Sequence, residues 1–191
     1  MTKNRLEAFS DAVIAIVITI MVLEMKVPHG TALEDLRPIL PVALSYLLSF
    51  VFLGIYWNNH HHMLHTASHV GGGVLWANMH LLFWLSLVPF VTGWMGENGF
   101  AAAPEALYGG VLLMAAIAYY VLAHALAHRH GSESAIRRAL GTDFKGRVSV
   151  LFYVVAIPLA FPAPWAALAI YVLVALMWLV PDKRMERVLG E

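Results

Sequence analysis

The chain consists of long apolar runs separated by short polar connections, and the length of these runs predicts helices that cross a membrane. A spanning helix needs about 20 mostly apolar residues. Six runs qualify, and they cover approximately residues 5–26, 38–66, 72–95, 104–129, 146–161 and 164–181. The pattern therefore predicts an all-α integral membrane fold in which residues 1–191 form a single six-helix transmembrane domain.

Prolines mark several boundaries in this pattern. Pro28 follows the first run, and Phe161-Pro162-Ala163-Pro164 separates the last two. Because proline can begin a turn but cannot continue a helix, the second of these stretches predicts a tight turn. Pro89 and Pro158 lie inside the third and fifth runs and predict kinks there.

The composition places the chain in lipid rather than in water. Of its 191 residues, 60% are hydrophobic and 13% are charged, and the mean hydropathy is +0.71. Soluble domains have about 45–50% apolar and about 25% charged residues. Twelve basic residues balance twelve acidic ones, so the charge gives no indication of a nucleic-acid partner. Because the sequence has no cysteine, disulfides, thiolate metal sites and thiol catalysis are excluded.

The basic residues are distributed unevenly along this pattern. With the N-terminus inside, ten of them fall on the cytoplasmic side, five of these between the fourth and fifth runs. Only Lys26 and Arg37 fall outside. This bias is what the positive-inside rule requires of six spans with both termini in the cytoplasm. An odd number of spans would place the basic tail on the wrong side.

The first run contains ionisable residues, which are costly inside a membrane. Arg5 and Glu7 can lie in the headgroup region, but Asp11 lies a full turn or more inside the apolar stretch. A carboxylate there needs a donor such as Arg5, a histidine, a tryptophan N–H or a serine of a neighbouring helix. Beyond it, Ile16, Ile20 and Leu23 share one helical face. Such an aliphatic stripe usually meets lipid or another helix, and lining a pore is the rarer alternative.

Two stretches resemble a known family. The first is the run Arg5-x-x-x-Phe9-Ser10-Asp11-Ala12-Val13-x-Ala15-Ile16, continued by Thr19, Leu23 and Glu24. The second is the run Tyr56-Trp57-Asn58-Asn59-His60-His61. Together they resemble the signature of the transmembrane protein 175 family of potassium channels. The length and the number of spans resemble the bacterial single-repeat branch of that family.

The resemblance implies a multi-pass homotetramer in the bacterial inner membrane, with the first helix of each subunit around a central pore. It implies that this helix is oriented by a hydrogen-bond network of Arg5, Phe9, Ser10, Asp11, Trp57, His60 and His61. It further implies a pore lined by Ile16, Thr19, Ile20 and Leu23, with Thr19 contributing to potassium preference. The sequence has no Thr-Val-Gly-Tyr-Gly filter loop.

The predicted function is a potassium-permeable cation channel that conducts passively through a hydrophobic constriction. A ring of aliphatic side chains can gate by dewetting, and it forces an ion to shed water. Potassium ions and membrane lipid are the predicted partners, and no cofactor, resident metal or nucleic acid is expected. The sequence has no His-Glu-x-x-His or Gly-x-Ser-x-Gly motif, so an enzyme is not expected.

Ten histidines support a rival hypothesis. His61, His65 and His69 recur every four residues, as do His124 and His128. Such a spacing on a helix can chelate zinc or nickel. A secondary transporter for a metal or another small cation, using these histidines, is therefore the alternative function. Interfacial roles and pH sensing remain open for the same residues.

Overall fold

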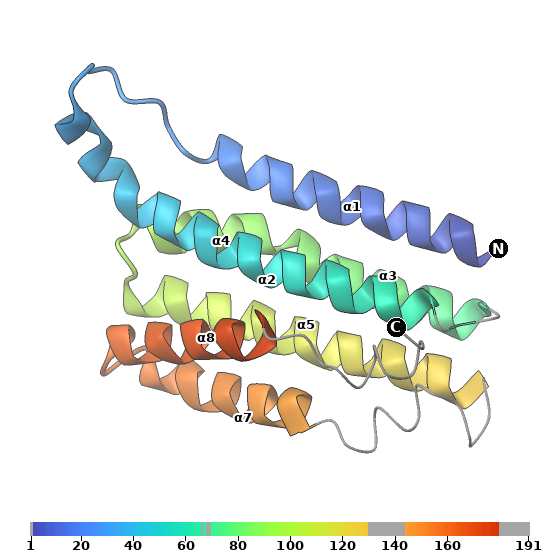
Figure 1. Ribbon diagram of the computed structural model, residues 1–191. Helices are drawn as coiled ribbons and strands as arrows, with labels where there is room; N and C mark the ends of the chain where they lie inside the picture. Colours follow the sequence, from blue (N-terminus) through green and yellow to red (C-terminus); the bar gives the residue numbers. More distant parts are fainter. Residues whose placement is uncertain (1, 66, 68–69, 130–143, 180–191) are drawn as a thin grey trace.

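The computed structural model describes residues 2–65, 67, 70–129 and 144–179, and every regular element in this part of the chain is a helix. The all-α prediction is therefore confirmed. Figure 1 shows the long helices lying side by side, with α1, α3 and α7 running opposite to α2, α5 and α8. The elements are α1 (Lys3–Leu23), the 3-10 helix η1 (Leu33–Ile39), α2 (Leu40–His65), α3 (Gly72–Ser86), α4 (Val88–Glu97), α5 (Ala102–Arg129), α7 (Phe144–Leu159) and α8 (Pro164–Leu179).

Four helical stretches are long and apolar enough to cross a membrane among the described residues. They are Lys3–Leu23, Leu33–His65, Gly72–Glu97 and Ala102–His128. The remaining two helices, α7 and α8, have 16 residues each. At 1.5 Å per residue, each is about 24 Å long, whereas the hydrocarbon core is about 30 Å thick. The structure thus supports a multi-pass membrane protein, and the count of six crossings stays a prediction.

The proline positions explain how the third span is built. The chain breaks between α3 and α4 around Leu87, and Pro89 lies in the first turn of α4. Proline fits a first turn because the N–H that it lacks would have no partner there. The sequence predicted a kink at Pro89, and the structure has a change from one helix to the next around Leu87. Pro158 lies in the last turn of α7, one residue before the end of that helix.

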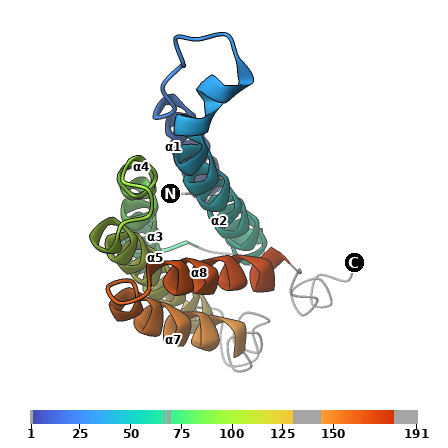
Figure 2. The same ribbon diagram turned by 90° about the vertical axis from the view of Figure 1, so that its left-hand side faces the viewer.

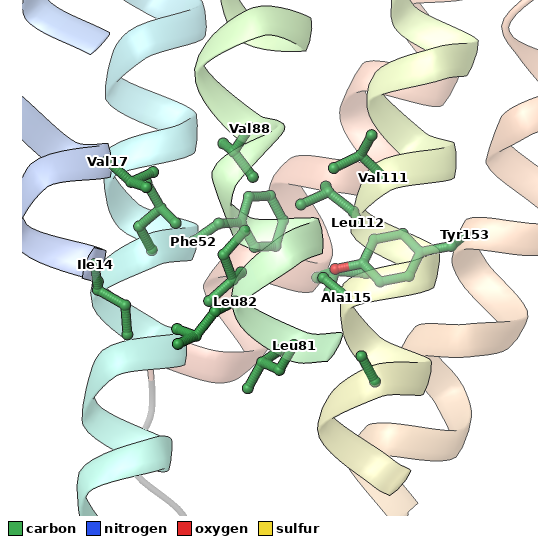
Figure 3. Packing of buried hydrophobic residues seen from close by; sticks show 14 of the residues in the cluster. Ile14, Val17, Phe52, Leu81, Leu82, Val88, Val111, Leu112, Ala115 and Tyr153 are labelled. Atoms are coloured by element: carbon green, nitrogen blue, oxygen red, sulfur yellow. The ribbon is translucent and has the colours of Figure 1, made fainter. Parts of the chain in front are cut away.

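The helices are arranged so that α1 lies at one edge of the bundle. α5 packs against α3, α4, α7 and α8, whereas α1 packs against α2, α3 and α4. α7 and α8 lie at the opposite edge from α1 (Figure 1, Figure 2). Between these two edges, buried side chains of α2, α3 and α5 form the core (Figure 3). They include Phe52, Leu81, Leu82, Leu112 and Ala115.

Gly96 allows α2 and α4 to approach closely. A Cβ at this position would lie 2.7 Å from the Cα of Val42 and would also collide with the Ser45 hydroxyl. Backbone atoms cannot rotate away, so we expect Gly96→Ala to destabilise the fold by about 1–3 kcal/mol. Thermal unfolding of the detergent-solubilised protein measures this effect.

Gly54, in α2, provides the matched control for this substitution. A Cβ there would meet nothing within 4 Å, and alanine is the better helix former. We expect Gly54→Ala to unfold at the same or a higher temperature than the parent protein. Equal stability of the Gly96 and Gly54 variants would contradict the close approach.

Candidate functional site

One face of α1 packs into its own subunit. The buried residues of this helix are Leu6, Ser10, Ile14, Val17 and Met21. Their spacing of three and four residues places them on a single helical face. The opposite face is left exposed, so the two faces of α1 have different environments.

A chain of buried polar side chains fastens this packed face to two other helices. The Ser10 hydroxyl donates to the Leu6 carbonyl oxygen at 2.9 Å and accepts from Asn78 Nδ2 at 2.9 Å. The Oδ1 atom of Asn78 lies 2.7 Å from Nε2 of His60. Because the Asn78 oxygen can only accept, Nε2 of His60 carries the proton. Ser10, Asn78 and His60 are all fully buried, and the chain links α1, α3 and α2.

A second set of contacts pairs α1 with α2 along their antiparallel lengths. Each contact moves four residues forward along α1 and four residues back along α2, which is one helical turn. The three contacts join Lys3 Nζ to the His65 carbonyl oxygen at 2.7 Å, Glu7 Oε1 to His61 Nδ1 at 3.0 Å, and Asp11 Oδ1 to Trp57 Nε1 at 3.0 Å. We call these three contacts the α1–α2 ladder.

The aromatic side chains of the ladder also contact each other. The His61 ring stacks between Trp57, with centroids 6.2 Å apart, and His65, with centroids 6.0 Å apart. The stacking holds the donors of α2 in one row opposite the carboxylates of α1. Asp11 therefore has a tryptophan N–H donor, one of the partners that its position in the membrane requires.

Five of the residues expected in the orienting network take part in these contacts, and two do not. Ser10, Asp11, Trp57, His60 and His61 all contribute to one of the two sets of contacts. The other two, Arg5 and Phe9, are exposed, and Arg5 makes no hydrogen bond or ion pair with any residue that the structure describes.

Arg5 and Phe9 lie on the outward face of α1. Arg5 precedes Phe9 by four residues and Ile16 by eleven, and both spacings are close to whole turns of a helix. Its guanidinium therefore belongs to the same face as the aliphatic stripe and faces away from the subunit's own core. A network role for Arg5 needs a partner outside the described part of one chain.

Three residues whose side chains form these hydrogen bonds or the ion pair were not expected from the sequence as members of the network. They are Lys3, Glu7 and Asn78. Glu7 precedes Asp11 by about one helical turn, and this spacing indicates that both carboxylates can face the same neighbouring helix. Asn78 is a lone amide in the run 72–95, where an unpaired polar group would be costly.

The aliphatic stripe lies exposed on the outward face of α1. Ile16 is 56% exposed, Ile20 43% and Leu23 78%. Thr19 is also exposed, and its hydroxyl lies 3.0 Å from the carbonyl oxygens of Ala15 and Ile16. Because the hydroxyl proton is donated to its own helix, the remaining lone pairs of the Thr19 oxygen are available to a cation.

A groove of about 640 Å³ runs between this stripe and α4. Ile16 and Ile20 line it from α1, and Pro89, Phe90 and Trp94 line it from α4. Its wall is mostly apolar, with Glu24 and Glu97 at one end. The stripe is therefore not covered by its own subunit.

A salt bridge lies at the acidic end of this groove. Lys26 Nζ is 2.8 Å from Glu97 Oε1, and both side chains are largely exposed. The hydrogen bond to Glu97 and the negative charge of that carboxylate raise the pKa of Lys26 above its ordinary value. Exposed pairs of this kind contribute little to stability.

The histidines do not form a metal centre in the described part of the chain. No three His, Asp or Glu side chains gather there at distances that would hold a metal ion. The His61 ring contacts Glu7, whereas His65 takes part in the α1–α2 ladder through its backbone carbonyl oxygen. His124 Nδ1 lies 2.9 Å from the Tyr120 carbonyl oxygen. His69 lies outside the described residues.

Comparison with known proteins gives consistent matches. A family model described as the endosomal/lysosomal potassium channel TMEM175 matches residues 5–89, the part that contains both sequence motifs. The chain is 53% identical over 191 residues to a potassium channel of Chryseobacterium sp. (strain P1-3), covering 100% of each chain. It is 32% identical over 185 residues to a potassium channel of Chamaesiphon minutus, covering 91% of each chain.

A solved structure has the same fold. It is the crystal structure of a lysosomal potassium-selective channel TMEM175 homolog from Chamaesiphon minutus, which is 29% identical and has a TM-score of 0.77. The match covers 93% of this chain and 96% of that one. The arrangement of helices described above is thus found in a channel.

Proposed function

The chain belongs to the TMEM175 family of potassium channels, and we propose that it conducts potassium passively through a central pore lined by the exposed stripe of α1. Its relatives in two bacteria are named as potassium channels. It is accordingly a potassium channel of the membrane.

One observation supports the pore most directly. α1 uses the polar side chains of Ser10, Asp11 and Glu7 to bind neighbouring helices of its own subunit. The stripe of Ile16, Ile20 and Leu23 stays exposed on a helix at the edge of the bundle. In a closed cyclic assembly, equivalent edges of the subunits meet around one axis. We propose a homotetramer in which α1 of each copy faces that axis.

The proposed selectivity follows from the chemistry of the stripe. An aliphatic ring gives an ion no replacement for its water shell, so passage costs dehydration energy. Potassium sheds water more easily than sodium and is therefore favoured. The Thr19 oxygen, with lone pairs directed away from its own helix, replaces part of the lost water. Before its last turn, α1 uses its backbone carbonyls in helical hydrogen bonds, so the proposed selectivity does not depend on a ring of free carbonyl oxygens there.

We also propose six crossings, with both termini in the cytoplasm of a bacterium and the chain in its inner membrane. The directions of the helices support this orientation, because α1 and α7 run the same way (Figure 1). Lys3 and Arg5 are in the first turn of α1, and Lys145 and Arg147 are in the first turn of α7. Positive charges at helix starts on one side are typical of the cytoplasmic face.

Ion flux from proteoliposomes tests this function. With a potassium gradient, and with and without a protonophore for charge balance, we expect fast, voltage-dependent potassium efflux only when the protonophore is present, because a channel moves uncompensated charge. Equally fast efflux without the protonophore would indicate coupling to protons and would favour a transporter. Light scattering of the purified protein measures the assembly, for which we expect four copies of the 21.1 kDa chain; a monomer would contradict the shared pore.

A further inference from the structure

A second cavity, of about 390 Å³, lies far from α1, between α2, α5, α7 and α8. This volume is in the range of pockets that bind small molecules. Its walls are apolar and aromatic, and they include Ile55, Ala116, Ile117, Tyr120, Val150 and Trp178. Ile117 is 36% and Tyr120 48% exposed, so within the described part of the chain the cavity opens to the surface of the bundle.

The cavity lies where the short helices end against the long ones. Arg147 is in the first turn of α7, and Trp178 is one residue before the end of α8. In contrast, α5 continues for nine residues beyond Tyr120, and α2 for six beyond Asn59. At 1.5 Å per residue these extensions are about 13 and 9 Å long. The cavity is therefore a notch in the end of the bundle where α7 begins.

Positive charge is placed at the mouth of this apolar cavity. Arg147 lines it and is exposed, and its guanidinium has no hydrogen-bond or ion-pair partner among the described residues. Lys145 Nζ lies 5.8 Å from the centre of the Trp178 ring. The polar groups of the wall bond to one another, since Trp178 Nε1 donates to Ser149 Oγ at 2.8 Å and Ser149 donates to the Lys145 carbonyl oxygen at 2.8 Å.

An apolar chamber with a cationic rim suits a ligand that has a hydrocarbon chain and an anionic head. Guanidinium groups bind phosphate oxygens bidentately, and basic pockets between helices on the cytoplasmic side bind anionic headgroups. We propose that this cavity binds an anionic phospholipid of the cytoplasmic leaflet, with its acyl chain against Ile117 and Val150 and its phosphate on Arg147. This proposal rests on the proposed function in one respect. If α1 lines the central axis, then α7 and α8, at the opposite edge of the bundle, face lipid.

Native mass spectrometry of the assembled protein, taken from micelles with equal phosphatidylglycerol and phosphatidylcholine, tests this site. We expect wild-type protein to retain phosphatidylglycerol preferentially, and Arg147→Gln to lower that preference about fivefold, or about 1 kcal/mol for one basic residue. Ala116→Trp fills the cavity and should abolish retention of both lipids. Arg37→Gln, which removes a charge from η1 at the other end of the bundle, and Leu173→Trp, on the exposed face of α8, should match wild type.

Three results would overturn the proposal. They are equal retention of the two lipids by wild type, an unchanged preference in Arg147→Gln, and displacement of the lipid by millimolar inorganic phosphate, which would indicate a soluble anion. Arg147 is exposed, so its substitution should not disturb folding. The Arg147→Gln result therefore tests the proposal even if Ala116→Trp fails to fold. Potassium flux, measured separately, distinguishes the two proposals: retained lipid without flux contradicts only the channel, and flux without lipid preference contradicts only the lipid site.

Discussion

Ile16→Asn is expected to reduce the discrimination between potassium and sodium by about tenfold. Ile16 is the first member of the exposed stripe beyond Asp11, and asparagine there would supply hydrogen-bonding groups in place of a methyl surface. A tenfold change corresponds to about 1.4 kcal/mol in the difference between the dehydration penalties of the two ions. A wetted ring lowers the dehydration penalty for both ions, so it removes the advantage of potassium.

Reversal potentials in planar bilayers, with potassium on one side and sodium on the other, measure this change. We expect the reversal potential of Ile16→Asn to move toward zero. Ile16→Leu is the matched control, because it keeps an apolar side chain of similar volume and should keep the parent value. If the asparagine variant reverses at the parent potential, Ile16 is not at the selective constriction.

Asn78→Leu is expected to destabilise the fold by about 1–3 kcal/mol. The substitution leaves Nε2–H of His60 buried without an acceptor, whereas Ser10 keeps its bond to the Leu6 carbonyl oxygen. An unsatisfied buried donor costs about 1–3 kcal/mol. Because the same chain of bonds fixes α1, we also expect reduced potassium flux from protein that still assembles.

A double-mutant cycle with His60→Leu separates the contribution of the His60–Asn78 hydrogen bond to stability from the contribution of side-chain packing. Replacing both partners with apolar side chains removes the unsatisfied groups, so the double variant should be more stable than the sum of the single effects predicts. Asn98→Ala is the control, since Asn98 is exposed and bonds only to its own helix at the Trp94 carbonyl oxygen. Additive losses in the unfolding temperature would argue against a direct His60–Asn78 bond.

The sequence predicted those features of the site that follow from the chemistry of a single residue. Asp11 inside an apolar run needs a donor, and Trp57 supplies it. Pro89 inside a long run needs a break, and α3 ends just before it. The family resemblance drawn from the first and second runs is confirmed by the relatives and the solved structure.

The rest of the site depended on packing that a linear pattern does not contain. The choice between His60 and His61 is one example, because adjacent residues on a helix point about 100° apart. Both are used: His60 faces α3 through Asn78, and His61 faces α1 through Glu7. The outward direction of Arg5 is another example, since only the packing of the opposite face determines it.

The α1–α2 ladder restricts α1 to discrete registers. A small rotation or slide of α1 along α2 would break all of its contacts together, so the two helices move as one body for displacements below a turn. A slide of four residues, about 6 Å, is the smallest shift that again places carboxylates opposite histidines, Glu7 at His65 and Asp11 at His61. We therefore expect the stripe to move relative to α2 in steps rather than continuously.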